Sequence, residues 1–156
     1  MIYITDYIND FSIEKKILKN SLITYKDKKI NFSSVKVIIV WHEKINKEFL
    51  KQFPNTKVVI RYGVGYDNVD VNYLKKNNIK LLITATANAV SVAEHVMYML
   101  LSLSKGITNY DTMVRSGDFR NDAKKLLTYE IFNKEILIMG FGRIGKILIK
   151  RCLGFD

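Results

Sequence analysis

A glycine pattern near the end of the sequence is the first feature that points to chemistry. The stretch GFGRIGK fits G-x-G-x-x-G and follows the apolar run ILIM. In such a pattern Gly140 allows a tight turn, Gly142 leaves space for a pyrophosphate, and Gly145 lets a helix pack closely on a strand. We expect the amides of Arg143 and Ile144 to point toward a phosphate at the positive end of the helix. The alternative is a strand-to-helix turn that binds no ligand.

A second glycine turn lies earlier, in RYGVGYDNVD. Glycines on both sides of Val64 free the backbone, so that the amides of Val64 and Gly65 can form an anion-binding nest. Arg61 precedes the turn and could add a two-pronged contact to a carboxylate. Ligands of parallel α/β sheets bind at the carboxyl ends of the strands, where this turn is expected. The alternative is an ordinary strand-to-helix turn. Asn68 and Asp70 are expected to be structural cap residues.

The elements that would position these turns follow an alternating pattern. Segments rich in Ile and Val alternate with short helical segments through the first 90 residues. This alternation is typical of an α/β fold with a doubly wound parallel sheet. We expect strands near residues 2–5, 36–41, 57–61 and 79–83, with a possible further strand at 21–25.

The pattern changes at Ser91. From there to about Gly117 the apolar residues follow helical spacing, which predicts one long helix of roughly 40 Å that crosses between domains. A new strand, EILIM at 135–139, then opens the glycine fingerprint. We therefore divide the chain into residues 1–90, a crossover helix at 91–118 and a third part at 119–156.

Composition and charge argue against several classes of protein. The formal charge is +10, but the lysines are scattered, which favours a solvated surface over a nucleic-acid partner. The single cysteine, Cys152, permits no internal disulfide and suits a reducing compartment, so we expect a cytoplasmic location. The N-terminal stretch MIYITDYIND lacks the basic start of a signal peptide, and the longest apolar stretch is too short for a membrane span. Two distant histidines and one cysteine make no metal site.

Three motifs together resemble a known family. VVIRYGVGYDNVDV, TATANAVSVAEHVMYMLLSLSK and ILIMGFGRIGK occur in the order found in D-isomer-specific 2-hydroxyacid dehydrogenases, close to the phosphoglycerate dehydrogenase and C-terminal-binding-protein branch. The resemblance covers essentially the whole chain. It implies a flavodoxin-like substrate domain, a crossover helix and the first βα unit of a Rossmann domain. In that family the substrate domain is built from both ends of a longer chain.

The resemblance implies an activity and a set of residues. The family transfers a hydride between the nicotinamide of NAD or NADP and a small 2-hydroxy or 2-keto acid. By resemblance, the nest around Val64 and its arginine hold the substrate carboxylate, and His42 lies in a loop that lines the same pocket. Asn88 matches a family asparagine near the cofactor cleft, and Val92 a position near the nicotinamide. Ala85 and Thr86 depart from the family, which usually has Pro-Gly before the AN pair.

The resemblance also predicts which groups this sequence lacks. The family's catalytic Arg, Glu and acid/base His, and the acidic residue that binds the ribose, would follow position 156. His95 shares one helix with Ser91 and Glu94 and is not expected to replace them, because no nucleophile turn is present. We therefore expect a truncated or split chain, inactive alone, whose Rossmann domain is completed by a second chain or a homo-oligomer. The alternative is a non-catalytic binding or regulatory module, or a degenerate relic, that keeps only the carboxylate-binding turn.

Overall fold

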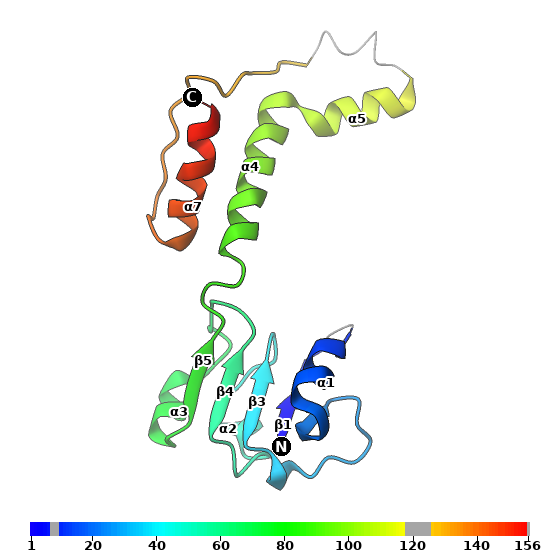
Figure 1. Cartoon of the computed structure of the whole chain (residues 1–156), viewed down its shortest axis with the longest axis vertical. Coiled ribbons are helices and arrows are strands. Elements are labelled where there is room, and N and C mark those ends of the chain that lie inside the picture. Colours follow the sequence, from blue (N-terminus) through cyan, green and yellow to red (C-terminus); the bar gives the residue numbers. More distant parts are fainter. Residues whose placement is uncertain (7–9, 118–125, 156) are drawn as a thin grey trace. The chain divides into compact units, whose positions relative to one another are not determined.

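The computed structural model describes residues 1–6, 10–117 and 126–155. The chain divides into two compact units, Met1–Ala85 and Thr86–Asp156, whose elements are labelled in Figure 1. The predicted boundary between residues 118 and 119 lies outside the described residues.

The first unit is built on a five-stranded sheet, and the predicted parallel arrangement is confirmed. Its strands are β1 (Ile2–Ile4), β2 (Leu22–Thr24), β3 (Val37–Val40), β4 (Val58–Arg61) and β5 (Lys80–Ile83). They lie in the order β2-β1-β3-β4-β5, and every neighbouring pair is parallel. The winding direction reverses between β1 and β3, and sheets of this type bind ligands in the crevice at such a reversal.

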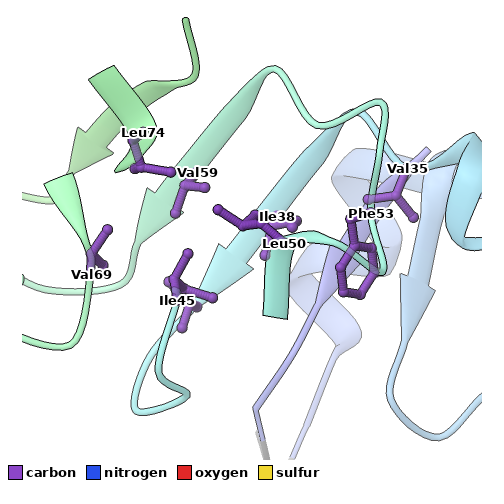
Figure 2. Close-up of a cluster of buried hydrophobic side chains, with 9 residues drawn as sticks. Val35, Ile38, Ile45, Leu50, Phe53, Val59, Val69 and Leu74 are labelled. Atoms are coloured by element: carbon purple, nitrogen blue, oxygen red, sulfur yellow. The ribbon is translucent and has the colours of Figure 1, made fainter. Parts of the chain in front are cut away.

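Helices connect these strands on both faces of the sheet. They are α1 (Ser12–Leu18), α2 (Lys47–Leu50) and α3 (Val71–Lys76), with the short 3₁₀ turns η1 (Lys19–Ser21) and η2 (Phe32–Ser34). The α2 and α3 side of the sheet holds the larger core, drawn in Figure 2. The side chains labelled there are Val35, Ile38, Ile45, Leu50, Phe53, Val59, Val69 and Leu74. Burial of this apolar surface fixes the register of the strands. The register in turn sets where the loops after β3 and β4 begin.

The opposite face of the sheet is covered less completely. Ile4, Phe11 and Ile39 form a smaller core there beside α1. Ile60 of β4 borders this cluster, and its register partner on β5, Leu82, is 51% exposed. The β5 end of this face therefore presents apolar surface to solvent.

The second unit corrects the prediction of one continuous helix. Helix α4 (Ala89–Lys105) ends at Gly106, and a separate helix, α5 (Ile107–Ser116), begins after it. Gly106 adopts the left-handed conformation, with φ of 59°, and its amide bonds back to the last turn of α4. Glycine enters this conformation without the penalty that a Cβ imposes, so it ends the helix although the apolar spacing continues.

The predicted strand at 135–139 does not form. Among the described residues of the second unit no strand is present, and Leu137 and Met139 are 85% and 90% exposed. A strand needs a partner for its backbone groups, and local sequence cannot provide one. Helix α7 (Arg143–Cys152), followed by the 3₁₀ turn η4 (Leu153–Phe155), does form, and Leu148 packs on α4 against Ala93 and Met97.

Candidate functional site

The turn after β4 depends on glycine at position 63. Gly63 has φ of 146°, and a Cβ built there would lie 1.3 Å from Nη1 of Arg61. The backbone of the turn is held by hydrogen bonds from the Tyr62 amide to Val40 O, 2.8 Å, and from the Thr84 amide to Gly63 O, 3.1 Å. Gly65 lies outside the left-handed region, and its added Cβ would make only an ordinary 3.5 Å contact. The conformational need for glycine in this turn therefore falls on Gly63.

Arg61 turns its guanidinium back onto the same turn. Its Nη1 donates to the backbone oxygen of Tyr62 at 2.7 Å. Its Nε is buried and has no acceptor among the described residues. A buried donor without an acceptor costs about 1–3 kcal/mol, so the present position of this side chain is not its best one for hydrogen bonding.

A small open pocket of about 190 Å³ lies at the carboxyl ends of β3 and β4. It brings together three of the predicted substrate-binding residues, His42, Arg61 and Gly65. Val64 lies in the same turn between the two glycines. The remaining lining residues are Trp41, Asp67 and Asn68. The pocket can therefore offer a guanidinium, an imidazole and backbone amides to an acidic ligand.

The loop that carries His42 is held from two sides. The carboxylate of Asp6, just after β1, accepts hydrogen bonds from the amides of Trp41, His42 and Glu43. From the other side, the side-chain amide of Asn68 donates to the backbone oxygens of Trp41 and Glu43, at 3.3 and 2.7 Å. Asn68 thus bridges to the neighbouring loop, and the prediction that it caps a helix is wrong.

The sequence reasoning missed Asp6, which holds the loop of this site, and it did not place Trp41 and Asp67 in the pocket. The available signal was a carboxylate directly after the first strand of a sheet whose winding reverses next to that strand. Asp70, by contrast, is a helix cap as predicted, since it accepts from the amide of Tyr73 at 2.9 Å.

Two ionisable groups near the pocket have shifted pKa values. Partial burial of the Asp6 carboxyl tends to raise its pKa, but hydrogen bonds from Thr5 and from the three loop amides outweigh burial and lower the pKa below 3.8. Burial raises the pKa of Tyr62 to about 12, aided by the hydrogen bond that its hydroxyl donates to Glu14 at 3.1 Å. The tyrosine side chain therefore stays neutral at ordinary pH and ties the turn after β4 to α1.

The glycine fingerprint of the second unit forms a tight turn that leads into helix α7. Gly140 has φ of 97°, and Gly142 is the N-cap residue immediately before α7. A Cβ at Gly145 would lie 2.7 Å from the backbone oxygen of Gly140, whereas one at Gly142 would meet nothing within 4 Å. The turn thus needs glycine at 145 for its own packing and has open space at 142. Arg143 and Ile144 form the first turn of α7.

The other two predicted positions also belong to the second unit. Asn88 immediately precedes α4, and its backbone oxygen accepts from the Val92 amide at 2.9 Å. The candidate site residues are therefore divided between the two units, with the pocket of His42, Arg61 and Gly65 formed wholly within the first. Within the described ranges no cluster of acidic, His or Cys side chains could hold a metal ion. None of the helices described is long and apolar enough to cross a bilayer.

Comparisons with known proteins agree on one family. A family model described as "D-isomer specific 2-hydroxyacid dehydrogenase, catalytic domain" matches residues 5–141. Glyoxylate reductase of Pyrococcus furiosus is 32% identical over 125 residues, which are 77% of this chain and 37% of that protein. D-Lactate dehydrogenase of Aquifex aeolicus, solved with NAD and lactic acid, matches with a TM-score of 0.85 at 26% identity, over 99% of this chain and 49% of that one.

An acyclic imino acid reductase, solved with NADPH and D-Arg, matches with a TM-score of 0.80 at 26% identity, over 99% of this chain and 53% of that one. The chain thus spans about half of each of these two solved proteins and a smaller share of the glyoxylate reductase.

Proposed function

Because this chain belongs to the D-isomer-specific 2-hydroxyacid dehydrogenase family, we propose that it forms the carboxylate-binding part of an oxidoreductase for small 2-hydroxy and 2-keto acids. The observation that carries this proposal is the pocket in which Arg61, His42 and Gly65 meet. An acidic ligand there would accept from the amides of Val64 and Gly65 and from the guanidinium. Arg61 would then exchange its bond to its own backbone for a bond to the ligand.

The cofactor is proposed to be NAD or NADP. The fingerprint residues fit a pyrophosphate, because Gly142 leaves open space beside the start of α7 and the amides of Arg143 and Ile144 lie at the positive end of that helix. When bound, the nicotinamide would exchange a hydride with C2 of the acid. Val92 is proposed to border that ring, and Asn88 to bind the substrate near the cofactor cleft. The chain's own task in this reaction is to bind and orient the acid by its carboxylate.

Turnover is proposed to require groups beyond these 156 residues. By the family resemblance, the acid/base His with its Glu, the catalytic Arg and the ribose-binding acid are proposed to lie outside these 156 residues. A second polypeptide would supply them, and either that polypeptide or a homo-oligomer would cover the apolar side chains of Leu82, Leu137 and Met139. The single cysteine supports a cytoplasmic setting for such an assembly.

A non-catalytic binding or regulatory module is the second candidate. The observation that favours it is the segment Glu135–Met139, which forms no strand in the part of the chain that the structure describes. In that case the carboxylate pocket would bind an acid without turning it over.

Titration with D-lactate tests the pocket. We expect the NMR signals of the amides at 61–66 to shift, and Arg61→Lys to weaken binding about tenfold, because a point charge cannot replace the planar fork. Arg115→Lys makes the same change in the second unit, at an exposed residue paired with Asp111, and should leave binding unchanged. Signals at 61–66 that stay still at high millimolar D-lactate, while others move, would place the site elsewhere.

A turnover assay separates the two candidate functions. The chain is mixed with NADH or NADPH and several 2-keto acids, with and without a polypeptide that carries the missing His, Glu and Arg. We expect no turnover from the chain alone and activity from the mixture. Binding of D-lactate without turnover in any mixture would favour the non-catalytic module.

A further inference from the structure

The loop after β3 surrounds a carboxylate of its own chain. Three consecutive amides, of Trp41, His42 and Glu43, point to the side chain of Asp6, which accepts from the last two at 3.0 and 2.7 Å. Successive amides that converge in this way form a concave nest for an anion. Here the anion is a side chain 35 to 37 residues earlier, so the contact joins the ends of two neighbouring strands.

This contact lies where the sheet changes its winding direction. β1 and β3 pair directly, with Ile4 opposite Ile39, so that Asp6 and the loop at 41–43 emerge side by side at the carboxyl edge. The amide of Thr5 donates to Ile39 O at 3.1 Å, and its hydroxyl donates to the Asp6 carboxylate at 2.6 Å. The rigid sheet therefore places the carboxylate, and the carboxylate in turn places the loop.

The loop supplies two neighbouring residues of the candidate pocket. Trp41 and His42 both line it, and their rings lie 4.3 Å apart between centroids at an angle of 31°. Both side chains are exposed, so burial alone does not fix their position. The hydrogen bonds from the loop backbone to Asp6 and Asn68 provide that position.

We propose that Asp6 is a positioning residue for the candidate pocket: its carboxylate gathers the amides of Trp41, His42 and Glu43 and so holds the imidazole of His42 beside Arg61. The proposal rests on the proposed function, because it needs an acid to bind in that pocket. An asparagine at position 6 would retain one acceptor oxygen, but it would turn an N–H₂ donor toward amides that are themselves donors. Asp6→Asn would therefore remove the negative charge and one acceptor oxygen at position 6, while the side-chain volume would change little.

The test compares Asp6→Asn with Asp10→Asn in the full chain. Asp10 is a matched control, because its carboxylate also accepts from a nearby amide and hydroxyl, both of Ser12, but lies outside the pocket. Trp41 is the only tryptophan of the chain, so its fluorescence reports on this loop. We expect Asp6→Asn to shift that emission and the 41–43 amide signals, and to weaken D-lactate binding about fivefold. A fivefold loss of affinity is expected if the loop occupies its binding position in one fifth of the molecules, because the apparent Kd is the intrinsic Kd divided by that fraction.

Asn68→Ala provides a second variant in case Asp6→Asn fails to fold, since it releases the same loop from the other side. The same shift and weaker binding are expected. The loop signals and D-lactate binding are measured at a temperature where the circular dichroism of each variant matches that of the wild type. A change in either then cannot come from general unfolding of the variant.

Each outcome decides the proposal. A shifted loop with weaker binding in Asp6→Asn or Asn68→Ala, and neither in Asp10→Asn, supports it. An unmoved loop, or a shifted loop with unchanged affinity, overturns the positioning role while leaving the proposed pocket intact. Wild-type protein that shows no binding of D-lactate at residues 61–66 refutes the proposed function, and the positioning role with it.

Discussion

Replacing Gly63 by alanine tests how the turn after β4 is built. The new Cβ would lie 1.3 Å from Nη1 and 2.5 Å from Cζ of Arg61, so the guanidinium must move. Its end is flexible and can swing away, but it then gives up its bond to the backbone oxygen of Tyr62, worth about 0.5–1.5 kcal/mol. The φ of 146° remains, and such strain costs a non-glycine residue about 1–3 kcal/mol. We expect a total loss of about 2–4 kcal/mol of unfolding free energy.

The assay is thermal unfolding followed by the fluorescence of Trp41, which reports on the first unit alone. For a unit of this size the expected loss lowers Tm by roughly 10–30 °C. Gly65→Ala is the matched control, because its Cβ makes only one ordinary contact and should change stability by less than about 0.5 kcal/mol. A Tm of Gly63→Ala equal to that of the wild type would refute this account of the turn. An equal loss of stability in Gly63→Ala and Gly65→Ala would also refute it.

Three further changes probe other contacts. The phenol of Tyr62 should ionise near pH 12 in an ultraviolet titration, and at lower pH in Glu14→Gln. Its contribution to the free energy of unfolding should be intact below pH 10 and lost as pH rises through about 12. The same titration curve for both proteins would contradict this. Asp70→Ala removes the cap of α3 and should lower the free energy of unfolding, measured with denaturant, by about 1 kcal/mol. An unchanged free energy of unfolding would show that the cap does not stabilise the protein. Gly145→Ala should loosen the start of α7, because its Cβ meets the oxygen of Gly140 at 2.7 Å, and unchanged hydrogen exchange there would speak against this.

The sequence predicted those parts of the fold in which local pattern and burial agree. The run VIIV of β3 is apolar on both faces, and the structure places it in the middle of the sheet. Gly106 shows the limit of periodicity, because apolar spacing continues past it although the backbone turns left-handed. The segment Glu135–Met139 shows another limit, since its apolar content predicted a strand but strand formation depends on a partner elsewhere.

The candidate site was predictable where the chemistry lies on one short motif. Arg61, at the end of β4, and Gly65, in the turn that follows, belong to one short motif, and the structure places both in one pocket. Asp6 could not be placed from local pattern, because its three amide partners are 35 to 37 residues away and the contact exists only once β1 and β3 pair. Asn68 was assigned to its own helix for the same reason, although its side chain reaches the next loop.

The exposed segment Glu135–Met139 also bears on the colloidal behaviour of the chain. A short apolar run that pairs with no strand among the described residues is a template on which identical chains can stack as β-structure. The formal charge of +10 opposes that stacking by mutual repulsion between copies. Because the Debye length falls from about 10 Å at 0.1 M salt to about 3 Å at 1 M, added salt screens the repulsion between copies. The tendency of Glu135–Met139 to associate is then no longer opposed. Solubility of this protein should therefore fall with ionic strength, and a charged residue in place of Leu137 should restore it.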